Sequence, residues 1–174
     1  MSAPPLTWSI DASAVPSAET FHFEANAREL EAIKRYAEVE DVASFKARVK
    51  IAPLSGGRFK AAGVLEARAI QASVVDLKPV PAAIEEDFAV EFWPEDSIGG
   101  AEAGPLSFEK DAPEPIAGGR LLIGEYLCEL FSVSLDPYPR NPDDAFEWDR
   151  KESDAPAGPF AKLVELRRKK TDGA

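Results

Sequence analysis

The chain has 174 residues, of which 45% are hydrophobic and 29% charged, and its net charge is −11. This composition predicts one folded domain over residues 1–174, because a disordered chain carries too few apolar residues to build a core. The acidic balance disfavours general nucleic-acid binding, since a negative surface repels phosphate. Any RNA contact would therefore need a local basic patch.

The composition also argues against an internal disulfide, a Cys/His zinc site and a membrane-spanning segment. Cys128 is the only cysteine and His22 the only histidine, so the chain can form no internal disulfide and cannot supply the roughly four ligands of a Cys/His zinc site. The first residues lack the basic and apolar segments of a signal peptide, and no apolar run approaches the roughly 20 residues that span a bilayer. We therefore expect a cytoplasmic protein without metal or cofactor.

The N-terminal segment contains strand and helix signals in turn. Apolar and polar residues alternate over 6–11 and 19–26, which predicts two short strands. Asn26 is expected to cap a helix over 27–39, with Glu29 in the position that completes a capping box.

Two long strand patterns then predict a hairpin. Residues 42–54 alternate, with apolar side chains on one face and three cations on the other. The turn signal "SGG" follows at 55–57, and the alternation returns over 58–77. Within that second strand, Gly63 indicates a bulge or the close approach of another backbone.

The second half of the chain is more varied. The prolines in 78–84 are expected to interrupt the sheet, and a further strand is expected over 85–96. Residues 94–119 are rich in Gly, Pro and acid, which predicts a flexible acidic loop. A helix is expected over 121–133, and a C-terminal tail with a short basic helix over 147–174.

The stretch "SLDPYPRNPD" at 134–143 follows the second helix. Pro137 and Pro139 forbid helix continuation and restrict the residues before them to extended geometry, so a rigid, extended exit is expected. Together these elements predict an α+β fold. In it an antiparallel sheet, able to curl into a partial barrel, is covered by the helices at 27–39 and 121–133. We expect a monomer.

Four segments of the chain resemble one known family. The stretch "QASVVDLKPV", the helix "LIGEYLCELFSVSL" and the motif "DPYPRNPDDAF" occur in this order, and "GPFAKLVELRRKK" follows near the end. This set resembles the YceD family, the large ribosomal RNA subunit accumulation proteins. The resemblance implies a non-enzymatic factor that is needed for normal levels of 23S ribosomal RNA and for large-subunit assembly. Many members carry cysteine where this chain has Ser73, so no metal proposal for them carries over.

Two sets of residues are candidate binding sites. The first is an edge formed by Asp136, Tyr138 and Arg140, since Tyr and Arg are frequent interface hot spots; the alternative is an architectural segment in which Tyr138 packs down. The second is a possible RNA-backbone surface, for which the alternative is a solvated sheet face. It comprises the cations Lys46, Arg48, Lys50, Arg58, Lys60 and Arg68.

The carboxylates between 85 and 96 leave further alternatives open. They could solvate the surface, dock a basic ribosomal protein, or carry acid/base or metal chemistry, although no calcium-loop spacing is present. The expected partners are a pre-large-subunit ribosomal particle and its ribosomal RNA or a basic ribosomal protein. The rival functions are an acidic chaperone for such a protein without RNA contact and, less favoured, a small carboxylate-based hydrolase. His22 is expected on the surface, and Cys128 in the core.

Overall fold

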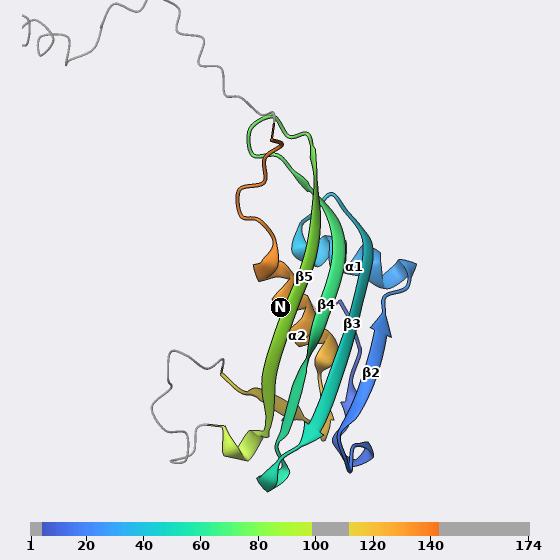
Figure 1. The fold of residues 1–174 in the computed structure, drawn as a ribbon, viewed down its shortest axis with the longest axis vertical. Helices are drawn as coiled ribbons and strands as arrows, with labels where there is room; N and C mark the ends of the chain where they lie inside the picture. The colour runs from blue at the N-terminus through green and yellow to red at the C-terminus, as the bar shows by residue number, and fades with distance from the viewer. Residues whose placement is uncertain (1–4, 99–111, 143–174) are drawn as a thin grey trace, which may run out of the picture. The chain divides into compact units, whose positions relative to one another are not determined.

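The computed structural model describes residues 5–98 and 112–142. Within them lie two helices, α1 (Ala27–Ala37) and α2 (Ile123–Ser134), and a seven-stranded sheet (Figure 1). The strands are β1 (Ile10–Asp11), β2 (Glu19–Glu24), β3 (Asp41–Pro53), β4 (Phe59–Ala72), β5 (Pro79–Pro94), β6 (Glu114–Ala117) and β7 (Arg120–Leu121).

The strands form one sheet in the order β1-β7-β6-β5-β4-β3-β2. The sheet curls into a half-barrel, and both helices lie on the same side of it (Figure 1). This side is called the inner face and the opposite side the outer face. The predicted α+β class and curled sheet are confirmed. One pairing differs from the antiparallel expectation, because β6 runs parallel to the end of β5.

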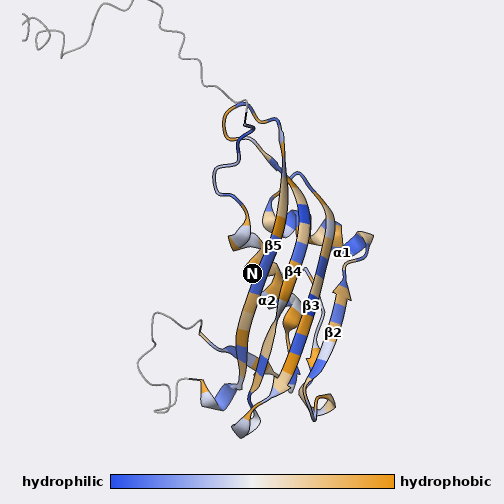
Figure 2. Ribbon diagram, in the orientation of Figure 1, coloured by the Kyte–Doolittle hydropathy of each residue, from blue (hydrophilic) through white to orange (hydrophobic). Residues whose placement is uncertain are grey.

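The β3–β4 hairpin follows the predicted alternation, which Figure 2 shows as bands of opposite hydropathy. The turn between the strands contains Gly56 at φ 74°, a left-handed conformation that glycine adopts without strain. Gly63 permits the predicted close approach. A Cβ atom there would lie 1.9 Å from the carbonyl oxygen of Arg48 on β3, so no other residue fits this backbone.

Helix α1 begins with the predicted capping box. The Asn26 side chain accepts hydrogen bonds from the backbone N–H groups of Arg28 and Glu29, and the Glu29 carboxylate accepts one from the Asn26 N–H at 2.8 Å. Glu29 also accepts a 2.9 Å hydrogen bond from the Trp8 indole, which joins the N-terminal segment to the helix. The helix ends at Ala37, two residues before the predicted end, because Glu38 turns left-handed.

The core lies between the inner face and the helices. Phe45 of β3 meets Phe131 of α2 edge to face at 5.5 Å, and Leu127 and Cys128 of α2 are fully buried. Gly124 gives α2 its close contact with the N-terminal segment, since a Cβ atom there would lie 2.8 Å from the Leu6 Cβ. Cys128 is therefore placed in the core, as predicted.

Several sequence expectations need correction. The strand predicted over 6–11 is confined to β1, Ile10–Asp11. The sheet is not interrupted over 78–84, because β5 begins at Pro79 and pairs with β4 from there onward. Strands tolerate proline where the missing N–H would face an open edge, and β6 pairs only with the last three residues of β5. Within the predicted acidic loop, residues 114–117 form β6.

Two predicted segments lie outside the described residues. They are residues 99–111 of the acidic loop and the C-terminal tail with its basic helix at 147–174. In the described part of the chain, neither helix has the length and apolar character that a membrane crossing requires.

Candidate functional site

Exposed apolar side chains gather where the β4–β5 turn meets the segment after α2. Four of the large exposed apolar residues of the described chain belong to these two segments: Val74, Val75, Leu77 and Tyr138. Leu77 is 78% exposed and Tyr138 67% exposed. These four residues are called the tip surface. Single exposed apolar residues are ordinary, but a contiguous group often marks a binding surface.

Two hydrogen bonds fix the segment after α2 to the hairpin. The buried Gln71 side chain donates from Nε2 to the carbonyl oxygen of Asp136 at 2.9 Å. The backbone N–H of Val74 donates to the carbonyl oxygen of Pro139 at 2.9 Å. Because Pro139 is itself buried, this part of the segment packs down and holds its neighbours in one position.

The β4–β5 turn is closed by its own hydrogen bonds. The Ser73 N–H donates to the Lys78 carbonyl at 2.8 Å, and the Leu77 N–H donates to the Ser73 carbonyl at 3.0 Å. The Asp76 carboxylate accepts from the Lys78 backbone N–H at 3.1 Å and pairs with the Lys78 ammonium. The hydrogen bonds from Lys78 lower the pKa of Asp76, so the turn keeps this arrangement at neutral pH.

The "DPYPR" motif presents two side chains and buries one. The Asp136 carboxylate accepts a 2.8 Å hydrogen bond from the Tyr138 backbone N–H, which tightens the motif into a local turn. Pro139 is buried, whereas the Tyr138 and Arg140 side chains are exposed. Tyr138 does not pack down as the architectural alternative required. In the described chain, Arg140 forms no ion pair with Asp136 or any other carboxylate.

The cations of β3 occupy the outer face. Lys46, Arg48 and Lys50 are all exposed, opposite the buried side chains of the same strand. Lys46 pairs with Glu24 of β2 at 2.9 Å. Among the described residues, Arg48 and Lys50 have no carboxylate within ion-pair distance, so these two cations face solvent.

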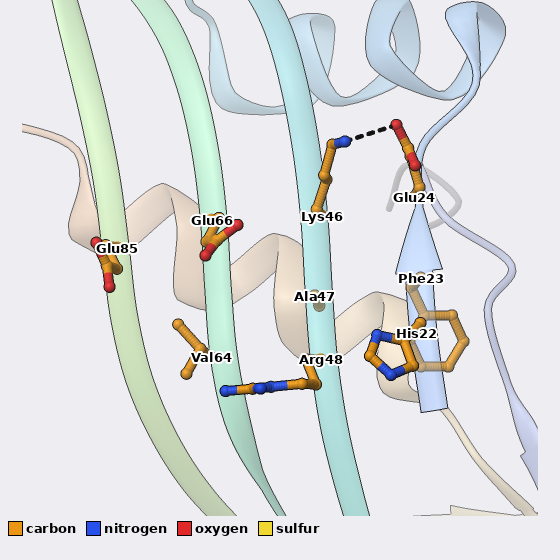
Figure 3. Close-up of a pocket in the computed structure, with 9 residues that line it drawn as sticks. All are labelled: His22, Phe23, Glu24, Lys46, Ala47, Arg48, Val64, Glu66 and Glu85. Carbon is orange, nitrogen blue, oxygen red and sulfur yellow. Dashed lines mark ion pairs between the residues drawn. The ribbon is translucent and has the colours of Figure 1, made fainter. Parts of the chain in front are cut away.

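An open depression of about 480 Å³ lies on this face (Figure 3). It extends across β2, β3, β4 and β5, and its polar lining residues are His22, Glu24, Lys46, Arg48, Glu66 and Glu85. Arg48 reaches toward Val64 between its own strand and β4, while Glu66 and Glu85 lie on the neighbouring strands (Figure 3). The depression therefore mixes cations with carboxylates.

The remaining predicted cations are Arg58, directly before β4, and Lys60 and Arg68 within β4. Arg58 donates to the Ser55 carbonyl at 2.9 Å, and its guanidinium lies over the Trp93 ring at 5.2 Å, so it is engaged within the protein. Lys60 is opposite Glu91, and Arg68 is opposite Ser44 and Ala83. The six cations share a face, but carboxylates of β2, β4 and β5 interleave them, so they do not make a continuous basic surface.

His22 and Cys128, the only histidine and the only cysteine of the chain, lie where the sequence predicts them. His22 is exposed on β2, opposite Arg48. Burial raises the pKa of the Cys128 thiol to about 12, so the reactive thiolate is scarce at neutral pH.

Sequence reasoning missed the contribution of the β4–β5 turn to the tip surface. The alternation over 58–77 predicts that Val74, Val75 and Leu77 end a strand, whereas they lie in a turn with their side chains exposed. The available signal was the run "SVVDLKP", in which apolar residues stand directly beside turn-forming Asp and Pro. The sequence pattern likewise gives no signal for Gln71, whose side chain makes the contact to Asp136.

Comparison with known proteins gives no family or structural relative, since no family model, no curated protein and no solved structure matches the chain.

Proposed function

We propose that this protein is a non-enzymatic cytoplasmic factor that supports 23S ribosomal RNA accumulation and large-subunit assembly. One observation carries the proposal. Two of the segments that resemble the YceD family, "QASVVDLKPV" and "DPYPRNPDDAF", contact each other through Gln71 and Asp136 and through Val74 and Pro139. Segments that are far apart in the chain thus build one surface.

The physical character of this surface suits recognition of a partner. Tyr138 and Arg140 are exposed on a segment that two prolines and two hydrogen bonds hold in one conformation. Stiffness of this kind reduces the entropy lost on binding, and Tyr and Arg are enriched among residues that dominate interface energy. A purely architectural exit from a helix would not require these side chains to face solvent.

The proposed partner is a pre-large-subunit ribosomal particle. Arg48 and Lys50 could add a contact to ribosomal RNA, since they are the cations of β3 without a nearby carboxylate in the described chain. Such a contact would involve few phosphates, because the surrounding face is mixed in charge. Its salt dependence should therefore be shallow.

Copurification tests this proposal. A tagged chain is recovered from cells with and without ribonuclease treatment, and the copurifying RNA and proteins are identified. The proposal expects precursor particles of the large subunit, and Tyr138→Ala or Arg140→Ala should reduce their recovery. Val133→Ala is the matched control, because Val133 is also highly exposed but lies on α2. Recovery of no large-subunit component would contradict the proposal.

An acidic chaperone for a basic ribosomal protein is the second candidate. The exposed carboxylates Glu85, Glu86 and Asp87 of β5 favour it, since complementary charge speeds the encounter with a basic protein. A ribonuclease-resistant, stoichiometric basic partner in the same copurification would support this candidate over the first.

A further inference from the structure

Strand β5 has an open edge along most of its length. On one side it pairs with β4 from Pro79 to Phe92, whereas on the other side β6 pairs only with Phe92–Pro94. Within the described part of the chain, no backbone hydrogen bond joins the open side of residues 80–91 to another segment. Figure 1 shows β5 at the margin of the large strands above the point where β6 joins.

An open edge carries unpaired N–H and C=O groups that can pair with another strand. Pro79 and Pro81 lack the N–H group, so they protect the start of this edge. No proline lies between Ala82 and Glu91, and this stretch is long enough for a typical partner strand of about five or six residues. The edge is therefore chemically competent for strand addition.

The side chains along this stretch are acidic on both faces. Glu85 and Asp87 point to the outer face, because they alternate with the buried Ile84 and Phe88. The Glu86 side chain points to the inner face and is also exposed. In the described chain, none of these three carboxylates forms an ion pair. A strand added here would meet negative charge on either side.

The register between β5 and β4 gives a further reason for a cationic partner strand. Glu85 lies directly opposite Glu66 of β4, and like charges in directly opposite positions destabilise a sheet. The cation directly opposite Glu66 on β3 is Lys46, which is already paired with Glu24 (Figure 3). A positive side chain placed beside Glu85 from the open edge would relieve this repulsion.

The end of the edge is acidic as well. Glu114 of β6 pairs in register with Phe92, and burial together with the Glu129 and Glu125 carboxylates of α2 raises the pKa of Glu114. Phe88 of β5 contacts Tyr126 of the same helix at 5.5 Å. Helix α2 therefore brings further negative charge near the inner side of β5.

We propose that the open edge of β5, over residues 82–91, binds an extended lysine- or arginine-rich segment of a partner protein as an added β-strand. Backbone hydrogen bonds supply the affinity, and alternate cationic side chains that meet Glu85 and Asp87 supply the selectivity. RNA is excluded as the occupant, because its phosphates would face these carboxylates. The proposal does not depend on a role in ribosome assembly.

A synthetic peptide of alternating lysine and threonine residues tests the proposal. Its affinity for the full chain is measured by fluorescence anisotropy and compared with that of a peptide of the same sequence in which every backbone nitrogen is methylated. Both peptides carry the same charge, but the methylated peptide has no backbone N–H group to donate to β5. We expect the unmethylated lysine–threonine peptide to bind at least about tenfold more tightly, since the methylated peptide loses these hydrogen bonds. Equal affinities would overturn the proposal.

Hydrogen exchange and charge reversal locate the binding site. The lysine–threonine peptide should protect amides within residues 82–91, with no comparable protection in β2, the strand at one end of the sheet. Glu85→Lys with Asp87→Lys should weaken binding about tenfold or more, whereas the matched pair Glu31→Lys with Glu40→Lys, whose carboxylates are exposed elsewhere, should change it less than about twofold. Protection confined to β2, or an equal loss in both pairs, would contradict the proposal.

A neutral pair of substitutions separates unfolding from lost recognition. Glu85→Gln with Asp87→Asn keeps the shape of both side chains and relieves the repulsion with Glu66, so the fold should be retained. Its peptide affinity should still fall by several-fold, because the cationic side chains lose their partners. Full affinity in this folded variant would show that these carboxylates do not select the peptide. A negative result in these peptide experiments does not change the outcome of the copurification test of ribosomal association. The two proposals can therefore fail separately.

Discussion

The Gln71 side chain donates a 2.9 Å hydrogen bond to the carbonyl oxygen of Asp136, a residue 65 positions further along the chain. This contact joins the end of β4 to the first residue of the "DPYPR" motif. It explains why the motif is stiff. Two prolines restrict the backbone locally, and Gln71 and Val74 then fix the restricted segment against the hairpin. The exposed Tyr138 and Arg140 are carried on this fixed segment.

Removal of the Gln71 amide should loosen the motif. We expect Gln71→Ala to lower the free energy of unfolding by about 1 to 3 kcal/mol, since it deletes a partly buried hydrogen bond and leaves a carbonyl without its partner. Urea denaturation measures this loss, and faster amide exchange should appear over residues 136–141. The control Ser17→Ala changes an exposed residue outside the sheet and should stay within about 0.5 kcal/mol. A stable Gln71→Ala protein with unchanged exchange would contradict this role.

The burial of α2 predicts a graded series of alanine substitutions. Leu127→Ala should cost about 2 to 5 kcal/mol, because this side chain is fully buried. Leu130 is only partly buried, so Leu130→Ala should cost less, about 1 to 2 kcal/mol. Val133→Ala, at an exposed position, should stay within about 0.5 kcal/mol. Equal losses for Leu127 and Val133, measured by denaturant unfolding, would mean that a different face of α2 is buried.

Glu114 predicts a specific dependence of stability on pH. Burial, with added repulsion from Glu129 and Glu125, raises the pKa of this carboxyl in the folded protein above its unfolded value. The charged form of Glu114 therefore disfavours folding. The free energy of unfolding falls as pH rises through the pKa of Glu114 in the folded protein. Glu114→Gln should raise the melting temperature at pH 7, and this difference should shrink toward zero below about pH 4, where the wild-type carboxyl is protonated in both states.

The control for this prediction is Glu40→Gln, at an exposed position before β3. Melting curves of both variants and the wild type at several pH values provide the comparison. A Glu114→Gln advantage that is the same at pH 4 and pH 7 would show that packing, and not charge, is responsible.

Local signals were sufficient to predict the central elements of the fold. The capping box at Asn26 and Glu29 depends on residues three apart, and the β3–β4 hairpin depends on alternation and a glycine turn. Strand β6 was not predicted, because it is four residues long and pairs in parallel with the distant end of β5. The prolines at 79 and 81 misled the prediction of β5, since sequence does not reveal that their side of the strand is open.

The candidate site was predicted only in part, for the same reason. Periodicity placed Lys46, Arg48 and Lys50 on the outer face, but the carboxylates that interleave the cations come from three neighbouring strands. Their positions depend on a register that alternation within one strand cannot supply. The exposure of Tyr138 likewise follows from the packing of Pro139 against the β4–β5 turn. In sequence, β5, β6, β7 and α2 separate this turn from Pro139.

The central claim is that the tip surface and Arg140 recognise a large-subunit precursor, and the level of 23S ribosomal RNA in cells tests it most directly. Cells that lack the native gene are supplied with the wild type, Tyr138→Ala, Arg140→Ala or the control Val133→Ala, and the ratio of 23S to 16S RNA is measured beside the melting temperature of each purified variant. Because Tyr138 and Arg140 are exposed, both variants should melt within a few degrees of the wild type, about the shift that 0.5 kcal/mol produces, yet lower the ratio. Val133→Ala should keep both values. An unchanged ratio of 23S to 16S RNA in Tyr138→Ala and Arg140→Ala would contradict the account. A lower ratio that is found only in variants with a lower melting temperature would contradict it as well.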